Sequence, residues 1–146
     1  MIVKAAAKIN LMLDVVGKLP NGYHSLFMIM QSVSCYDTVR VDRTGKNGIK
    51  IISSDERVPK DEKNIAYKAA EAFFDYAGIS DRGIEIEIGK KIPMAAGLAG
   101  GSADGAAVIK AIRALFVPNE NIEKFKFIQD APERIFRELV FHIRNA

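Results

Sequence analysis

Apolar and polar positions follow a strand-like pattern in the first third of the chain. Residues 9–16 and 26–33 are largely apolar runs, which predict two buried strands, and a Pro-Asn-Gly turn at 20–22 separates them. Residues 38–42 alternate between apolar and polar side chains, and residues 49–52 resume this pattern after a glycine-containing turn. The last two segments are therefore predicted to form a β-hairpin.

The middle of the chain changes to helical spacing. Residues 63–77 place apolar side chains three and four positions apart, and Gly78 follows as an expected C-terminal cap. Residues 84–88 read Ile-Glu-Ile-Glu-Ile, which is the clearest strand signal in the chain, and a second helix is predicted over 102–116. This order of elements predicts an α+β fold with a mostly antiparallel sheet backed by helices.

The connection between the strand at 84–88 and the second helix carries the main chemical signal. Residues 93–102 read Pro-Met-Ala-Ala-Gly-Leu-Ala-Gly-Gly-Ser, with three glycines in five positions. Glycine allows positive φ and close approach of the backbone to a ligand, and the first N–H groups of a helix point outward. Together these features predict an anion site, most often a phosphate site.

The glycine spacing excludes two common nucleotide motifs. A Walker loop requires a Lys after its last glycine, and none follows Gly101; the spacing from Gly97 to Gly100 does not fit the dinucleotide fingerprint. The alternative is a strand-to-helix connection whose glycines only permit tight packing.

Composition narrows the class of protein. The 146 residues are enough for one domain, and 49% hydrophobic with 27% charged residues is typical of globular proteins. A net charge of +3 is too small to indicate nucleic acid, so we expect no such partner. Cys35 is the only cysteine, which excludes a disulfide framework. No secretory or membrane-length apolar run is present, and we expect a cytoplasmic protein with no membrane partner.

Two further segments give the glycine-rich connection a family context. Residues 7–11 read Ala-Lys-Ile-Asn-Leu, and residues 20–26 read Pro-Asn-Gly-Tyr-His-Ser-Leu. With Asp-Glu-Lys-Asn-Ile at 61–65 and the segment at 93–102, the chain resembles the GHMP family of small-molecule kinases.

The resemblance runs from about Lys4 to Phe116 and sets an expected domain division. It implies the family's N-terminal, ATP-binding domain over residues 1–117, with a left-handed βαβ element, and a divergent helical tail over residues 118–146. The family's C-terminal domain is expected to be absent. Within the family, the chain most resembles the branch whose members use ATP and Mg²⁺ to phosphorylate the 2-hydroxyl of a cytidine diphosphate-linked methylerythritol in isoprenoid precursor synthesis.

The resemblance also implies roles for individual residues. Lys8 matches the catalytic lysine, which stabilises charge on the transferred phosphoryl group. Asn10, Tyr23 and His24 match substrate-binding positions, with an aromatic face for the cytosine and an imidazole for the base edge. Ser102 is expected near the phosphates or Mg²⁺. The implied ATP-binding residues are Asn64, Lys90, Pro93, Met94, Ala95, Ala96, Gly97, Leu98, Ala99, Gly100, Gly101, Ser102 and Ala103.

The residues alone leave other roles open. Asn64 fits equally a helix cap, Lys90 a solvated strand end, and Lys8 a snorkelling side chain like Lys4. The family's downstream Gly-Ala-Asp-Val-Pro-Phe element is not found, and only Asp130 in an Asp-Ala-Pro triplet offers a replacement for its base. We therefore expect a truncated protein whose exposed domain face is a self-association surface.

Two other functions also stay open. The first is a different GHMP kinase, for mevalonate, homoserine or a sugar, and the Asn-Gly-Tyr-His turn at 21–24 argues against it. The second is a non-catalytic nucleotide- or RNA-binding half-domain, and the dispersed positive charge argues against that.

Overall fold

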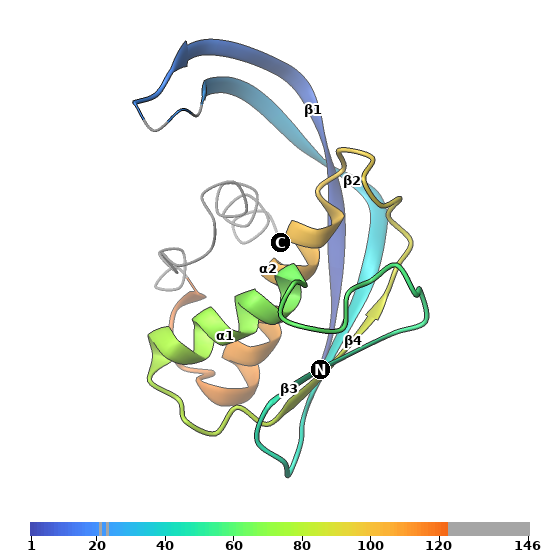
Figure 1. The fold of residues 1–146 in the computed structure, drawn as a ribbon, viewed down its shortest axis with the longest axis vertical. Coiled ribbons are helices and arrows are strands. Elements are labelled where there is room, and N and C mark those ends of the chain that lie inside the picture. The colour runs from blue at the N-terminus through green and yellow to red at the C-terminus, as the bar shows by residue number, and fades with distance from the viewer. Residues whose placement is uncertain (21, 23, 123–146) are drawn as a thin grey trace.

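The fold is a four-stranded sheet with two helices on one face (Figure 1). The computed structural model describes residues 1–20, 22 and 24–122. The elements in chain order are β1 (Ile2–Lys18), β2 (His24–Arg43), β3 (Ile49–Ser53), α1 (Ile65–Ala77), β4 (Ile84–Gly89) and α2 (Gly100–Phe116). The sheet order is β1-β2-β4-β3, with β3 and β4 parallel and the other pairs antiparallel. The predicted α+β class with a mostly antiparallel sheet is confirmed.

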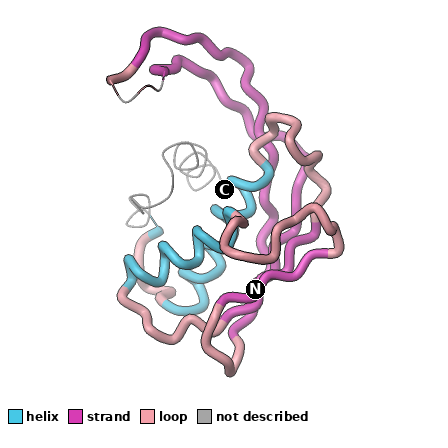
Figure 2. The backbone as a smooth tube through the Cα atoms, in the orientation of Figure 1, coloured by secondary structure: helices cyan, strands magenta, loops and turns pink. Residues whose placement is uncertain are grey.

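A long antiparallel hairpin formed by β1 and β2 dominates the sheet. The predicted strands at 26–33 and 38–42 are parts of the single strand β2, and the strand predicted at 9–16 lies inside β1. The pairing runs from Ile2 opposite Arg40 to Lys18 opposite His24. Its outer half projects away from the helices (Figure 2). There it exposes apolar side chains of Leu11, Leu13, Val15, Val16, Phe27 and Ile29.

The hairpin predicted between residues 38–42 and 49–52 is wrong. Strand β4 lies between β2 and β3, so residues 49–53 pair with β4 in parallel and make no ladder with β2. A parallel pair needs a crossover connection, and α1 supplies it, which gives the expected βαβ unit. Since β4 carries the strongest alternation, with Ile84, Ile86 and Ile88 all buried, the central position of the sheet suits it best.

The core lies between the sheet and the two helices. Helix α1 begins at Ile65, after its N-cap Asn64 and two residues later than predicted, and ends at Ala77 before the predicted cap Gly78, which has a φ of 65°. The rings of Phe73 and Phe116 both pack edge-on against Phe74, at centroid distances of 6.2 and 5.1 Å. Full burial of such a side chain contributes about 1.5–3 kcal/mol. This core holds the two helices against each other and against the sheet.

Among the described residues, no helix is both long enough and apolar enough to cross a membrane.

Candidate functional site

The glycine-rich connection between β4 and α2 adopts an unusual backbone. Ala95, Gly97 and Ala99 all have left-handed φ values, of 57°, 74° and 59°. Ala99 is the N-cap of α2 and makes no side-chain capping hydrogen bond. The amide groups at Gly100 and Gly101 therefore begin the helix without a side-chain acceptor, which is the arrangement that favours an anion. Strained backbone of this kind is concentrated at ligand-binding sites.

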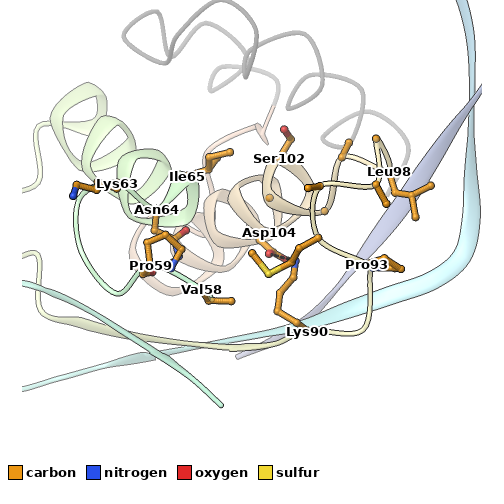
Figure 3. A pocket seen from close by; sticks show the side chains of 17 residues that line it. Val58, Pro59, Lys63, Asn64, Ile65, Lys90, Pro93, Leu98, Ser102 and Asp104 are labelled. Carbon is orange, nitrogen blue, oxygen red and sulfur yellow. Dashed lines mark hydrogen bonds and ion pairs between the residues drawn. The ribbon is translucent and has the colours of Figure 1, made fainter. Parts of the chain in front are cut away.

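A cavity of about 390 Å³ opens beside this connection (Figure 3). Its volume lies in the range of small-molecule sites, which is about 300–1,000 Å³. The start of α1, the connection and the start of α2 form its wall, and Asn64, Lys90 and residues 93–102 all line it. The sequence reasoning missed Val58, Pro59, Lys63, Ile65 and Asp104, which also line it.

Ala103 is the exception among the expected nucleotide residues. It is buried and does not line this cavity; it lines a second one between β1 and α2. The reason is its place on the sheet-facing side of α2, and the structure therefore places it behind the site.

The glycines of the connection serve two different purposes. A Cβ at Gly100 would lie 3.1 Å from the Lys90 Nζ, and one at Gly101 would lie 3.1 Å from the Ile65 Cδ1. Gly97 has open space around it but needs its positive φ. Close packing thus accounts for Gly100 and Gly101, and backbone conformation accounts for Gly97.

The backbone at Ala99 gives a stability prediction. We expect Ala99→Gly to raise the free energy of unfolding by about 0.5–1 kcal/mol, because a left-handed conformation is costly for Ala and available to Gly. Urea denaturation measures this change. Gly78→Ala is the matched control, since Gly78 has a φ of 65° and open space, and it should lower stability by about 1 kcal/mol. A loss of stability in Ala99→Gly would contradict the expectation.

Lys90 is held between two buried carboxylates. Its Nζ donates to Asp104 Oδ2 at 2.8 Å and to Asp37 Oδ2, and the exposed fractions of the three side chains are 8%, 6% and 0%. The alternative of a solvated strand end is therefore wrong. Sequence reasoning missed both acids, although Asp37 continues the alternation of the buried Val39 and Val41 and could have been placed on the same face.

Asp37 and Asp104 differ in how fully their carboxylate oxygens are hydrogen-bonded. Asp37 accepts three hydrogen bonds, whereas Asp104 Oδ1 is buried and has no hydrogen-bond partner. Burial raises the pKa of Asp104 to about 7, although the charge of Lys90 opposes this. Burial works to lower the pKa of Lys90, but the charges of Asp104 and Asp37 raise it overall.

These shifts predict how stability depends on pH. The folded state keeps the Asp104 proton up to about pH 7, whereas an unfolded Asp loses it near pH 4. The folded state therefore binds more protons in this window, and the free energy of unfolding falls as pH rises through it. Asp104→Asn should remove this fall, so that the free energy of unfolding, measured by urea denaturation, changes less between pH 5 and pH 8 than in the wild type. The control Asp81→Asn breaks an exposed ion pair and should change stability by less than about 0.5 kcal/mol.

Lys8 approaches the connection from the side of β1. Its backbone N–H donates to Leu98 O at 3.1 Å, and its Nζ lies 3.3 Å from Gly97 O and 3.4 Å from Asn10 Oδ1. Lys8 is 4% exposed, so it does not snorkel to solvent as the exposed Lys4 does. An irregularity of the β1–β2 ladder lies between the two lysines, where residues 34 and 35 of β2 are inserted opposite the step from Ala6 to Ala7.

The expected substrate residues are not gathered in one place. Asn10 contacts Lys8, but His24 is exposed at the far end of the hairpin, opposite Lys18. Ten residues of β1 between Lys8 and Lys18 correspond to roughly 33 Å of strand. The structure thus does not bring His24 to the glycine-rich connection, and its role stays a prediction. Tyr23 and Asp130 lie outside the described residues.

Asn64 combines a structural role with a place at the cavity. Its Oδ1 accepts from the Ala66 N–H at 2.8 Å, and its Nδ2 donates to Pro59 O at 2.6 Å. The helix-cap interpretation is confirmed, and the residue also lines the cavity wall.

Comparisons with known proteins agree with this arrangement. Residues 64–133 match the N-terminal domain of GHMP kinases. The chain is 57% identical over 116 residues to the 4-diphosphocytidyl-2-C-methyl-D-erythritol kinase of Clostridium acetobutylicum, covering 80% of this chain and 41% of that protein. The corresponding kinase of Clostridium botulinum (strain Kyoto / Type A2) is 50% identical over 128 residues, covering 88% and 45%. The chain spans less than half the length of these curated relatives.

Solved structures give the same result. A crystal structure of 4-(cytidine 5'-diphospho)-2C-methyl-D-erythritol kinase superimposes with a TM-score of 0.76 at 29% identity, covering 99% of this chain and 49% of that one. A mevalonate kinase superimposes with a TM-score of 0.67 at 16% identity, which shows a shared fold. With its glycine-rich connection, its βαβ unit and these relatives, the chain is a homologue of the GHMP kinases and has the fold of their N-terminal domain.

Proposed function

We propose that this chain binds ATP in the cavity beside the glycine-rich connection and phosphorylates the 2-hydroxyl of 4-diphosphocytidyl-2-C-methyl-D-erythritol. The observation that carries the proposal is the start of α2, which has no side-chain cap and opens onto a cavity lined by that connection. The GHMP family uses ATP, and the 57% identity to a kinase of this name supports the choice of substrate.

The proposed nucleotide site uses backbone more than side chains. The amides of Gly100 and Gly101 would receive the phosphates, since the helix start offers both unpaired donors and a favourable dipole. The segment from Pro93 to Ala99 is apolar, and its three alanines and one glycine leave main chain open to a bulky anion. ATP, when bound there, supplies the phosphoryl group.

Mg²⁺ fits this site only if most of its ligands are phosphate and water oxygens. Among the described residues, no three His, Cys, Asp or Glu side chains gather as a metal site. Mg²⁺ in kinases keeps several waters and binds substrate phosphates with few protein ligands. Ser102, buried at the start of α2, is the proposed protein contribution, and it would complete a shell made mainly of phosphate and water oxygens.

Lys8 is the proposed catalytic residue. Its ammonium lies within 3.3 Å of the Gly97 carbonyl, so it is held at the connection that would carry the phosphates. A fixed positive charge there stabilises the negative charge on the transferred group. Asn10, which contacts the same ammonium, would face the acceptor hydroxyl, and Tyr23 and His24 would recognise the cytosine.

The domain division and the self-association surface are part of the same proposal. Residues 1–117 would form the ATP-binding unit, with residues 118–146 as a separate tail. The outer half of the β1–β2 hairpin exposes apolar side chains on both of its faces, a property that favours association. Sedimentation velocity of Val15→Lys against the wild type tests this, with a shift toward monomer expected.

An assay of ADP release tests the proposed activity. Purified chain at high concentration is incubated with ATP and Mg²⁺, with and without 4-diphosphocytidyl-2-C-methyl-D-erythritol. ADP release that depends on the substrate would support the proposal, and no release under single-turnover conditions would end it. Cytidine diphosphate should raise the melting temperature; protection by mevalonate or homoserine in its place would favour another GHMP kinase.

A further inference from the structure

Asp37 joins the end of β4 to the glycine-rich connection. Its Oδ1 accepts hydrogen bonds from two consecutive amides, Lys91 N at 2.5 Å and Ile92 N at 2.8 Å. Its Oδ2 accepts from the ammonium of the preceding residue, Lys90. One side chain on β2 therefore fixes three successive residues at the entrance to the connection.

The same carboxylate also reaches the exit of the connection through Lys90. The Lys90 Nζ donates at 2.8 Å to Asp104 in the second turn of α2 (Figure 3). The ammonium has room for this because residue 100 is a glycine, where a Cβ would lie 3.1 Å from it. The two ends of the connection are thus tied to each other through a single cation and two acids.

Of the two acids that contact Lys90, Asp37 is the more deeply buried and the more fully hydrogen-bonded. Asp37 is 0% exposed, and every atom of its carboxylate has a partner, whereas Asp104 leaves one oxygen without any. A buried carboxylate is retained only where such bonds offset its desolvation. Asp37 does not line the cavity, so it has no direct contact with a ligand there.

We propose that Asp37 is a positioning residue, which holds the glycine-rich connection and Lys90 in the conformation that binds the phosphates of the nucleotide. This inference rests on the proposed function. It assigns to a side chain outside the cavity the task of keeping the anion site formed before the ligand arrives, which saves the ordering cost on binding.

Asp37→Asn tests this with little change in shape. An amide has one acceptor, so its NH₂ group must face either the Lys90 ammonium or the amides of Lys91 and Ile92. We expect the Kd for Mg²⁺-ADP, measured by calorimetry, to rise at least about tenfold. We also expect amide hydrogen exchange without nucleotide to become faster over residues 91–101 while residues 84–88 stay protected.

The two readouts separate positioning from general destabilisation. Faster exchange in every strand alike, or an unchanged Kd with unchanged exchange over 91–101, would overturn the proposal. A higher Kd without faster exchange there would also overturn it. Asp42→Asn, on the same strand but in an exposed ion pair, should change neither quantity.

If Asp37→Asn does not fold, amide hydrogen exchange in the wild-type chain tests the proposal instead. The amides of Lys91 and Ile92 should then exchange as slowly as those of the buried strand β4, and exchange at the rate of exposed residues 94–97 would overturn the inference. If the wild type binds no Mg²⁺-ADP, the proposed function fails. The exchange measurements then decide alone whether Asp37 fixes the connection.

Discussion

Replacing Lys90 with methionine is expected to lower the free energy of unfolding by about 3–5 kcal/mol, because it leaves two buried carboxylates without their cation. Asp37 and Asp104 have almost no exposed surface, so solvent cannot replace the ammonium. The loss should shrink as pH falls, since a shared proton then relieves the repulsion. Urea denaturation at pH 5 and pH 8 measures both effects.

Lys50→Met is the matched control for this variant. It removes the same charge from the ion pair of Lys50 with Glu85, whose N···O distance is 2.8 Å, but the lysine side chain is 68% exposed. Exposed pairs contribute about 0–1 kcal/mol. If Lys90→Met destabilises no more than Lys50→Met, the buried cluster does not hold this part of the fold together.

Lys8→Met is expected to lower the rate of phosphoryl transfer by about 10²–10³-fold with little change in nucleotide affinity. The reason is the position of Lys8, which reaches the Gly97 carbonyl but does not line the cavity. Single-turnover kinetics with the cytidine diphosphate substrate measure the rate, and calorimetry with Mg²⁺-ADP measures the affinity.

Lys4→Met provides the comparison on the same strand. Lys4 is exposed, and its ammonium lies 5.8 Å from the centre of the Tyr36 ring, away from the glycine-rich connection. This variant should keep both the rate and the affinity. Equal rates for the two variants, or a nucleotide affinity lost with Lys8, would show that Lys8 is not the catalytic lysine.

Local patterns predicted the elements of the fold better than their pairing. The alternation of residues 84–88 and the cap Gly78 depend on near neighbours, and the structure has both where the sequence predicted them. The pairing of β3 depends on β4, some thirty residues later, so a local turn signal predicted the wrong partner. Strand order depends on which strands pair along both of their edges, as β4 does with β2 and β3, and short patterns do not contain that information.

The sequence predicted the backbone segment of the site, but it did not predict the buried charged side chains beside it. Residues 93–102 line one cavity as expected, because glycine content and a helix start are visible in sequence. Lys90 lines the cavity, and its side chain is clamped between Asp37 and Asp104 instead of being solvated. Those acids come from β2 and α2, and only the sheet order brings them together. The alternation shared with Val39 and Val41 was the one available signal for Asp37.

The β1–β2 hairpin also has a consequence for the synthesis of the chain on the ribosome. Both of its strands are complete at Arg43, but α2, which packs against them, ends only at Phe116. At about 5–20 residues per second, roughly 4–15 s of translation separate the two events. During that interval the hairpin's apolar inner face has no helix to cover it. The nascent chain therefore offers a binding surface for a chaperone early in its synthesis.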